Sequence, residues 1–241
     1  ASSKEDGFAH IPDLSDLPVR EDADYVHICE NNTIFGTKYH SLPDTKGIPL
    51  VADQSSCFLS EPCDVSKYGV IYAGVQKNVG PSGLAIVIIR GDLIRDELLV
   101  PTPTMLKWKV QVDNNSLYNT PNCFAIYTCG KVFKWLKKNG GLTAMKERNE
   151  EKAKLLYDYL DSSKYIATAR KDSRSIMNVT FRTPSAELDA LFVEEAKKHD
   201  IVSIKGHRAV GGMRASIYNA MTKEGVMALI EFMKEFEKEH L

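Results

Sequence analysis

Residues 68–83 read YGVIYAGVQKNVGPSG. The first part is a short apolar run, 70–73, rich in the β-branched and aromatic residues that favour a strand. A turn rich in glycine and proline follows, and Lys77 lies where the two meet. A lysine beside a buried strand loses part of its hydration, which favours the neutral amine that a Schiff-base nucleophile needs. The stretch therefore predicts a buried strand followed by a functional lysine.

Three further apolar runs, 25–28, 48–52 and 84–89, surround this stretch. They are apolar throughout rather than alternating, which is typical of strands covered on both faces in an α/β sheet. We therefore expect a mainly parallel sheet in the first part of the chain. In such sheets the functional residues lie at the strand ends, where the loops gather.

The second part of the chain changes character. Helical spacing predicts helices over 122–138 and 142–160, joined at Asn139-Gly140-Gly141. The run 176–181 alternates in the manner of a half-exposed antiparallel strand. A helix over 183–199, strands at 201–204 and 214–217, and a final helix capped by Thr222 complete a smaller α+β domain. We expect 1–125 to belong to the large α/β domain, and 126–241 to hold a linking helix and the small C-terminal domain.

Composition describes an ordinary globular chain. Of its 241 residues, 43% are hydrophobic and 26% charged, which is enough to bury a sizeable core. Lys and Arg number 31 against 32 Asp and Glu, so no global field attracts nucleic acid or an anionic membrane. No apolar run approaches the roughly 20 residues that span a bilayer, and the first residues show no signal core. We expect a cytoplasmic protein without nucleic-acid or membrane partners.

The five cysteines are an odd number and form no C-x-x-C pair. This pattern indicates neither a disulfide framework nor a zinc site, and no other metal site is predicted. We expect Cys57, Cys63, Cys123 and Cys129 to be small buried hydrophobes in a reducing compartment.

Polar residues follow each of the first three predicted strands. They are Asn31-Asn32-Thr33, Asp53-Gln54-Ser55-Ser56 and Gln76-Lys77. If the strands share one sheet, these residues meet in one cleft. The ordinary interpretation stays open for each of them, because an Asp after a strand often caps a turn and a loop lysine is often solvated. The Gly80-x-x-Gly83 turn lacks the dinucleotide and P-loop patterns, so a nucleotide-binding loop is rejected.

An acid at one strand end and a lysine at another are the two groups that pyridoxal phosphate chemistry requires. The lysine forms an imine with the cofactor and carries protons, and the carboxylate keeps the pyridine nitrogen protonated so that the ring accepts electrons. Asp53 and Lys77 are the candidates for these roles.

Five segments resemble a known family. They are NTIFG at 32–36, VADQSS at 51–56, YGVIYAGVQKNVGP at 68–81, NTP at 119–121 and GHRAVGGMRAS at 206–216. Together they closely resemble the phosphoserine aminotransferase family, in class V of the fold type I pyridoxal phosphate enzymes. The resemblance runs from about Asp24 to the C-terminus. It implies part of a fold type I large domain followed by the smaller C-terminal domain.

The resemblance also implies roles around the cofactor. Lys77 corresponds to the lysine that forms the internal aldimine and acts as acid and base in the 1,3-proton shift. Asp53 corresponds to the partner of the pyridine nitrogen, and Thr33 to the residue that hydrogen-bonds the phenolic oxygen. Gln76 and Ser55 correspond to contacts of the cofactor phosphate.

Other roles concern the substrate and a second subunit. Asn119 and Thr120 are implied to reach the cofactor phosphate of the neighbouring subunit, and hence a homodimer. His207 and Arg208 are implied to bind the substrate's phosphate or side-chain carboxylate, and Arg214 its α-carboxylate. The rigid fork of an arginine suits a carboxylate on physical grounds alone. From the residues alone, Arg214 could equally pair with a structural acid, and His207 could cap a turn.

The implied reaction transfers an amino group between L-glutamate and 3-phosphohydroxypyruvate, giving O-phospho-L-serine and 2-oxoglutarate in L-serine biosynthesis. Whether the longer phosphorylated substrate of pyridoxine biosynthesis is also accepted stays open. One alternative is another class V reaction, such as that of a desulfurase, although Cys57 and Cys63 lie in no persulfide motif. The other alternative is a folded domain without cofactor and without activity.

The family's chain is longer at its N-terminus. There it carries a segment for the substrate phosphate, a small-residue loop for the cofactor phosphate and an aromatic residue that stacks on the pyridine ring. None of these precedes Asp24, and both Trp108 and Trp135 lie beyond the lysine. We expect a truncated chain that lacks about the first third of the enzyme, with unpaired sheet edges, an uncovered apolar face and poor activity of its own.

Overall fold

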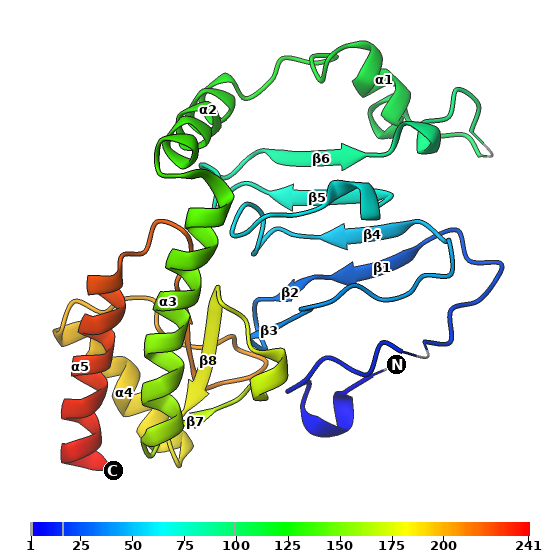
Figure 1. Cartoon of the computed structure of the whole chain (residues 1–241). Coiled ribbons are helices and arrows are strands. Elements are labelled where there is room, and N and C mark those ends of the chain that lie inside the picture. Colours follow the sequence, from blue (N-terminus) through cyan, green and yellow to red (C-terminus); the bar gives the residue numbers. More distant parts are fainter. Residues whose placement is uncertain (1, 16, 99) are drawn as a thin grey trace.

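The computed structural model describes residues 2–15, 17–98 and 100–241 (Figure 1). One sheet is built from the first part of the chain and a second from the last part. Helices α2 (Cys123–Lys138) and α3 (Gly141–Ser162) connect them, and α3 runs down beside the second sheet (Figure 1). This arrangement is the expected α/β part followed by a smaller α+β part.

The first sheet has the strand order β1-β4-β5-β6. Its strands are β1 (Val26–Cys29), β4 (Leu50–Asp53), β5 (Val70–Gly74) and β6 (Ala85–Ile89). β1, β4 and β5 are parallel, whereas β6 pairs with β5 in antiparallel fashion. The carboxyl ends of the three parallel strands therefore lie at one edge, as the site prediction requires.

The expectation that both faces of these strands are covered is wrong. Leu50, Ala52, Ile71 and Ala73 point to one face and form a buried core. Their neighbours alternate to the other face, where His27 and Cys29 are exposed. The run of apolar letters concealed this alternation, because small and β-branched residues occupy both sides of the pleat.

Short elements that the sequence did not predict lie between the strands. β2 (Asn31–Asn32) and β3 (Thr37–Lys38) form an antiparallel hairpin directly after β1. α1 (Trp108–Asp113) precedes α2, and short 3-10 helices lie at Lys4–Asp6, Val65–Lys67, Gly91–Leu93, Thr104–Leu106 and Lys171–Ser173. The hairpin matters most, because it presents Thr33 at its turn.

Both long helices begin where the sequence predicts. The Asn122 side chain accepts a hydrogen bond from the Ala125 amide at 3.1 Å and caps α2. Gly140 takes the left-handed conformation, with φ of 93°, and turns the chain from α2 into α3.

The second sheet is antiparallel, in the order β7-β8-β9. It consists of β7 (Ile166–Ala167), β8 (Asn178–Arg182) and β9 (Met213–Ser216). Helices α4 (Ala186–Lys198) and α5 (Lys223–His240) pack with it, and Thr222 caps α5 as predicted. A core of aromatic side chains, including Phe181, Phe192 and Phe236, holds this part together.

Two expectations for this part are wrong. β8 is antiparallel but not half-exposed, because Asn178 to Phe181 are all buried. Its apolar face meets the aromatic core, and its polar face is covered by the first part of the chain, where the Thr180 hydroxyl donates to the Phe35 carbonyl at 3.0 Å. Residues 201–204 form no strand, and this edge is represented only by a bridge between Lys205 and Met213.

The five cysteines are free thiols. Cys57 and Cys129 are buried as expected, but Cys63 and Cys123 are exposed, and so is Cys29. A run of large apolar side chains between 105 and 135 is also exposed, among them Leu106, Phe124 and Tyr127. Among the residues described, no helix combines the length and apolar character that crossing a membrane requires.

Candidate active site

Lys77 lies in the turn that follows β5, and its amine reaches the hairpin after β1. Lys77 Nζ donates a hydrogen bond to Thr33 Oγ1 at 3.1 Å. Partial burial lowers the pKa of Lys77, and the nearby Arg214 charge acts in the same direction. Asp53 and Cys29 oppose this shift in pKa but do not outweigh it. The arrangement increases the fraction of neutral, nucleophilic amine.

Asp53 is the last residue of β4, and it stands between two other side chains of the same row. Cys29 of β1 and Tyr72 of β5 are its partners across the sheet. Its Oδ1 accepts a hydrogen bond from the Ser55 amide at 2.8 Å. The turn-cap interpretation of Asp53 is therefore correct, yet a cap of this kind also fixes the carboxylate and leaves Oδ2 for another partner.

Ser55 and Gln76 lie beside the strand end of β5. Ser55 Oγ accepts a hydrogen bond from the Gly74 amide at 3.0 Å. The Gln76 amide folds over the same glycine, so that a Cβ at position 74 would lie 2.8 Å from Gln76 Oε1. The missing side chain of Gly74 thus leaves room for Gln76 next to the backbone to which Ser55 is hydrogen-bonded.

Arg214 reaches the site from β9 of the second sheet. Its Nε is buried and has no hydrogen-bond partner in the described part of the chain, and no carboxylate there lies within ion-pair distance of its guanidinium. A cavity of about 400 Å³ borders Arg214 and Ser216, but its other walls are residues of the small domain between 199 and 229, and none of Thr33, Asp53, Ser55 and Lys77 lines it. The structural-acid interpretation of Arg214 thus finds no partner, and a half-buried arginine with a free donor is suited to bind an anion.

His207 and Arg208 lie in the loop that precedes β9. His207 Nδ1 accepts the Ala209 amide at 3.2 Å, so this histidine does cap a turn. Arg208 is exposed. No hydrogen bond or ion pair among the described residues joins either side chain to Lys77, and the structure leaves them outside the Lys77 cluster.

Asn119 and Thr120 lie in the exposed segment between α1 and α2. Asn119 Nδ2 donates to the neighbouring Thr120 carbonyl at 3.3 Å. They too stand apart from the cluster formed by Thr33, Asp53, Ser55 and Lys77.

Two residues of the site were missed from the sequence, Cys29 and Tyr72. Both flank Asp53 in the sheet, and Tyr72 also contacts His27, whose Nε2 lies 3.0 Å from the tyrosine oxygen. Aligning the ends of the predicted strands 25–28 and 48–52 would have paired Cys29 with Asp53, but the same alignment of 70–73 would have placed Tyr72 beside Val51.

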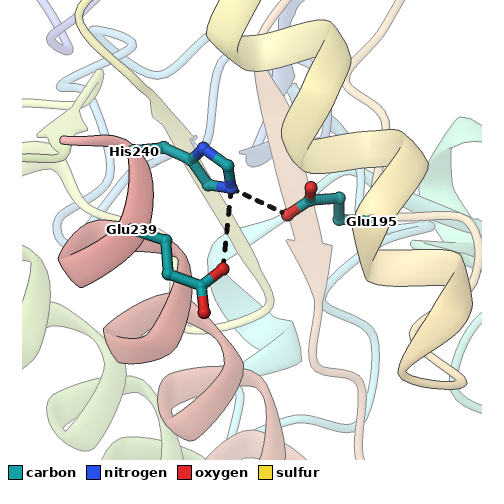
Figure 2. A group of neighbouring side chains, drawn as sticks. All are labelled: Glu195, Glu239 and His240. Atoms are coloured by element: carbon teal, nitrogen blue, oxygen red, sulfur yellow. Dashed lines mark hydrogen bonds and ion pairs between the residues drawn. The ribbon is translucent and has the colours of Figure 1, made fainter.

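A second cluster of titratable groups lies in the small lobe. His240 Nε2 lies 3.2 Å from Glu195 Oε2 and 3.8 Å from Glu239 Oε2 (Figure 2). The cluster ties the last turn of α5 to α4, at the end of α5 that is remote from the Lys77 turn (Figure 1). The His240 ring lies between the two carboxylates, and we assign the three groups a structural role.

The family described as aminotransferase class-V matches residues 2–229. The phosphoserine aminotransferase of Desulfosudis oleivorans is 55% identical over 240 residues, which are 99% of this chain and 66% of the relative. That of Nitrosomonas europaea is 52% identical over 248 residues, covering 100% of this chain and 67% of the relative.

Solved structures agree. Phosphoserine aminotransferase from Bacillus circulans subsp. alkalophilus superposes with a TM-score of 0.95 at 43% identity, over 99% of this chain and 66% of that one. The pyridoxal phosphate-bound enzyme of Trichomonas vaginalis gives 0.89 at 39% identity, over 94% of this chain and 64% of that one. The chain thus spans about two thirds of the length of these relatives. With this identity along almost all of its own length, the chain belongs to the class-V aminotransferases and, within them, to the phosphoserine aminotransferase family.

Proposed function

We propose that this chain performs a pyridoxal phosphate-dependent transamination between L-glutamate and 3-phosphohydroxypyruvate, giving O-phospho-L-serine and 2-oxoglutarate in L-serine biosynthesis. One observation carries the proposal: a partly desolvated lysine lies near a fixed carboxylate and near an arginine whose buried Nε has no hydrogen-bond partner among the described residues. An amine, an acid and a carboxylate receptor are the groups that such a reaction needs at one place.

The residues fit the cofactor of this family. Pyridoxal phosphate supplies an electron sink for the charge that develops at the substrate Cα. Asp53, held by the Ser55 amide, is suited to keep the ring nitrogen protonated. Thr33 is placed to orient the phenolic oxygen, since its hydroxyl already meets the Lys77 amine. Ser55 and Gln76 both contact Gly74, and we propose that they receive the cofactor phosphate there.

Lys77 is proposed as the acid and base of the reaction. Because burial lowers its pKa, a larger share of the amine is free to take a proton from the substrate Cα near neutral pH. The hydrogen bond to the Thr33 hydroxyl holds the amine at the edge of the sheet where β4 ends with Asp53. We propose that Lys77 thereby faces the Cα–H bond of the substrate, which must be broken in the reaction.

Arg214 is proposed to bind the α-carboxylate of the substrate, because its Nε–H donor has no partner among the described residues and can donate to a carboxylate oxygen. His207 and Arg208 are proposed to receive the phosphate or side-chain carboxylate. The turn that His207 caps lies next to β9, close in sequence to Arg214. Use of the longer phosphorylated substrate of pyridoxine biosynthesis remains a separate proposal.

We further propose a homodimer in which Asn119 and Thr120 serve the partner's cofactor, in keeping with their exposure and with the exposed apolar residues of α1 and α2. We keep the proposed division into part of a large domain, 1–125, and a linking helix with the small domain, 126–241; two separate cores support two domains, although Cys129 of α2 packs in the first core. A cytoplasmic location without nucleic-acid or membrane partners completes the proposal.

A covalent tag tests the assignment of Lys77. The chain is incubated with pyridoxal phosphate, reduced with borohydride and mapped by peptide mass spectrometry. We expect one pyridoxyl group on Lys77, none in Lys77→Ala, and none on Lys152, the other lysine whose pKa burial lowers. A tag on Lys152, or one spread over exposed lysines, would refute the proposal and favour a cofactor-free domain. Comparing turnover of phosphorylated and unphosphorylated keto acids separates this reaction from other class V reactions.

A further inference from the structure

Three buried asparagines from distant segments converge on one turn. Asn78 follows Lys77, Asn149 lies on α3, and Asn219 lies just after β9. Each donates its side-chain N–H to a different carbonyl of the turn 58–60: Asn78 to Phe58 at 3.0 Å, Asn219 to Leu59 at 2.9 Å and Asn149 to Ser60 at 3.0 Å. We call Asn78, Asn149 and Asn219 the asparagine triad.

The turn needs these donors because of its backbone conformation. Leu59 has a φ of +59°, in the left-handed region that branched residues rarely enter. Carbonyls that leave a regular ladder and remain buried require another donor. The triad supplies one donor to each of three successive carbonyls.

The three amides are also joined to one another. The Asn219 backbone amide donates to Asn78 Oδ1 at 3.0 Å. Asn149 Nδ2 donates to Asn219 Oδ1 at 2.9 Å. Asn219 therefore links Asn78 to Asn149, and a displacement of its segment disturbs hydrogen bonds of the other two.

Three of the four segments that the triad joins carry a residue of the proposed site, and α3 with Asn149 is the exception. Lys77 precedes Asn78, Asp53 begins the segment that runs to the turn 58–60, and Arg214 lies on the strand that ends just before Asn219. We propose that the asparagine triad positions Lys77, Asp53 and Arg214 relative to one another. This buried hydrogen-bonded cluster thereby sets the geometry of a site whose residues come from both sheets. This inference rests on the proposed function for the roles of the three residues, but its structural part can be tested without the cofactor.

The test measures how readily the Lys77 amine reacts in the cofactor-free chain. Acetylation of Lys77 by acetic anhydride is followed by peptide mass spectrometry as a function of pH. If Asn78 holds the Lys77 turn against the protein, Asn78→Ala lets the amine reach water. The midpoint of the acetylation curve then moves to higher pH, and acetylation at pH 8 becomes about threefold slower.

A kinetic readout tests the Arg214 side. Asn219→Ala is expected to raise KM for L-glutamate about fivefold, with a smaller change in kcat, because the carboxylate receptor is displaced while the lysine keeps its place. Tyr165→Phe is the matched control. It also removes a buried side-chain hydrogen bond to a carbonyl, that of Met233 at 3.0 Å, but inside the core of the small lobe. Neither readout should change in this control.

An unchanged acetylation midpoint in folded Asn78→Ala overturns the proposal, and so does an equal shift in Tyr165→Phe. If Asn78→Ala fails to fold, Asn149→Ala takes its place, with a shift of the same direction expected and its absence counting against the triad. Failure of wild-type Lys77 to take up the pyridoxyl tag would refute the proposed function alone, since the acetylation curves do not depend on the cofactor.

Discussion

Replacing Arg214 by methionine is expected to separate binding from stability. Arg214 has a buried Nε without a partner in the described part of the chain, and such an unsatisfied donor costs about 1–3 kcal/mol. Removing it should therefore leave the free energy of unfolding unchanged or raise it by about 1 kcal/mol. Binding should suffer, because two charge-assisted hydrogen bonds to a carboxylate contribute about 1.5–3 kcal/mol each. The expected loss in kcat/KM for L-glutamate is thus about 10² to 10⁴-fold.

Urea unfolding and steady-state kinetics measure the two effects on the same preparations. Arg214→Lys keeps the charge but loses the fork, so its kcat/KM should fall between those of the wild type and Arg214→Met. Arg174→Met is the structural control. Arg174 NH1 donates to Asp161 Oδ2 at 2.9 Å, and the guanidinium lies 4.3 Å from the centre of the Tyr157 ring. This control should lower the free energy of unfolding by about 1–3 kcal/mol and leave kcat/KM nearly unchanged.

One combination of results would refute the reasoning. If Arg214→Met unfolds as easily as Arg174→Met while kcat/KM for L-glutamate stays within about tenfold of wild type, Arg214 is a structural residue. The carboxylate receptor would then have to be sought elsewhere, with Arg208 as the next candidate.

Three other measurements probe different parts of the molecule. Cys29 is exposed and lies in the same row of the sheet as Asp53, so maleimide should modify it in the cofactor-free chain and bound pyridoxal phosphate should protect it. The exposed Cys63 is the control and should react in both states. Equal protection of the two thiols would contradict the proposed position of the cofactor. Hydrogen bonding to Arg174 lowers the pKa of Asp161 to about 2, whereas the value in the unfolded chain is near 3.9. The ionised Asp161 therefore stabilises the fold fully above about pH 4, and this stabilisation is lost as the pH falls through about 2. Urea midpoints measured over this range should fall less steeply in Asp161→Asn, and an identical slope would argue against the shift. Asn31→Ala should lower the free energy of unfolding by about 2–4 kcal/mol in urea, because its buried amide donates to both Ser56 and Asn178; a loss below about 1 kcal/mol would show that water replaces these bonds.

The parallel strands and the residues at their ends could be predicted from the sequence, because strand propensity and turn residues act locally. Family and fold class are confirmed. Thr33 and Lys77 meet as the strand-end argument requires, and Arg214 lies near enough for its charge to act on the amine. The functional roles of these residues stay predictions.

What could not be predicted depends on contacts between distant segments. The alternation of residues in β8 correctly predicted one apolar and one polar face. Whether water or protein covers the polar face depends on the hairpin that carries Asn31, which lies 147 residues from its partner Asn178 in the chain. The Cys63 and Cys123 thiols were expected to be buried because free cysteine usually is, yet both lie on loops or helix ends that reach the surface. The residues 201–204 are mostly apolar but form no strand, and only the following residue, Lys205, makes a bridge, to Met213.

The antiparallel pairing of β5 and β6 has a consequence for how the molecule assembles. The turn that carries Lys77 closes a hairpin of close neighbours in the chain, so its closure costs little entropy and can occur early in folding. Asn78 and Asn219, by contrast, are 141 residues apart. The lysine turn therefore forms within a local unit, whereas its alignment with Arg214 depends on contacts between segments far apart in the chain. In a refolding experiment, recovery of glutamate binding should lag behind recovery of the hairpin, which makes binding a marker for the last step of folding.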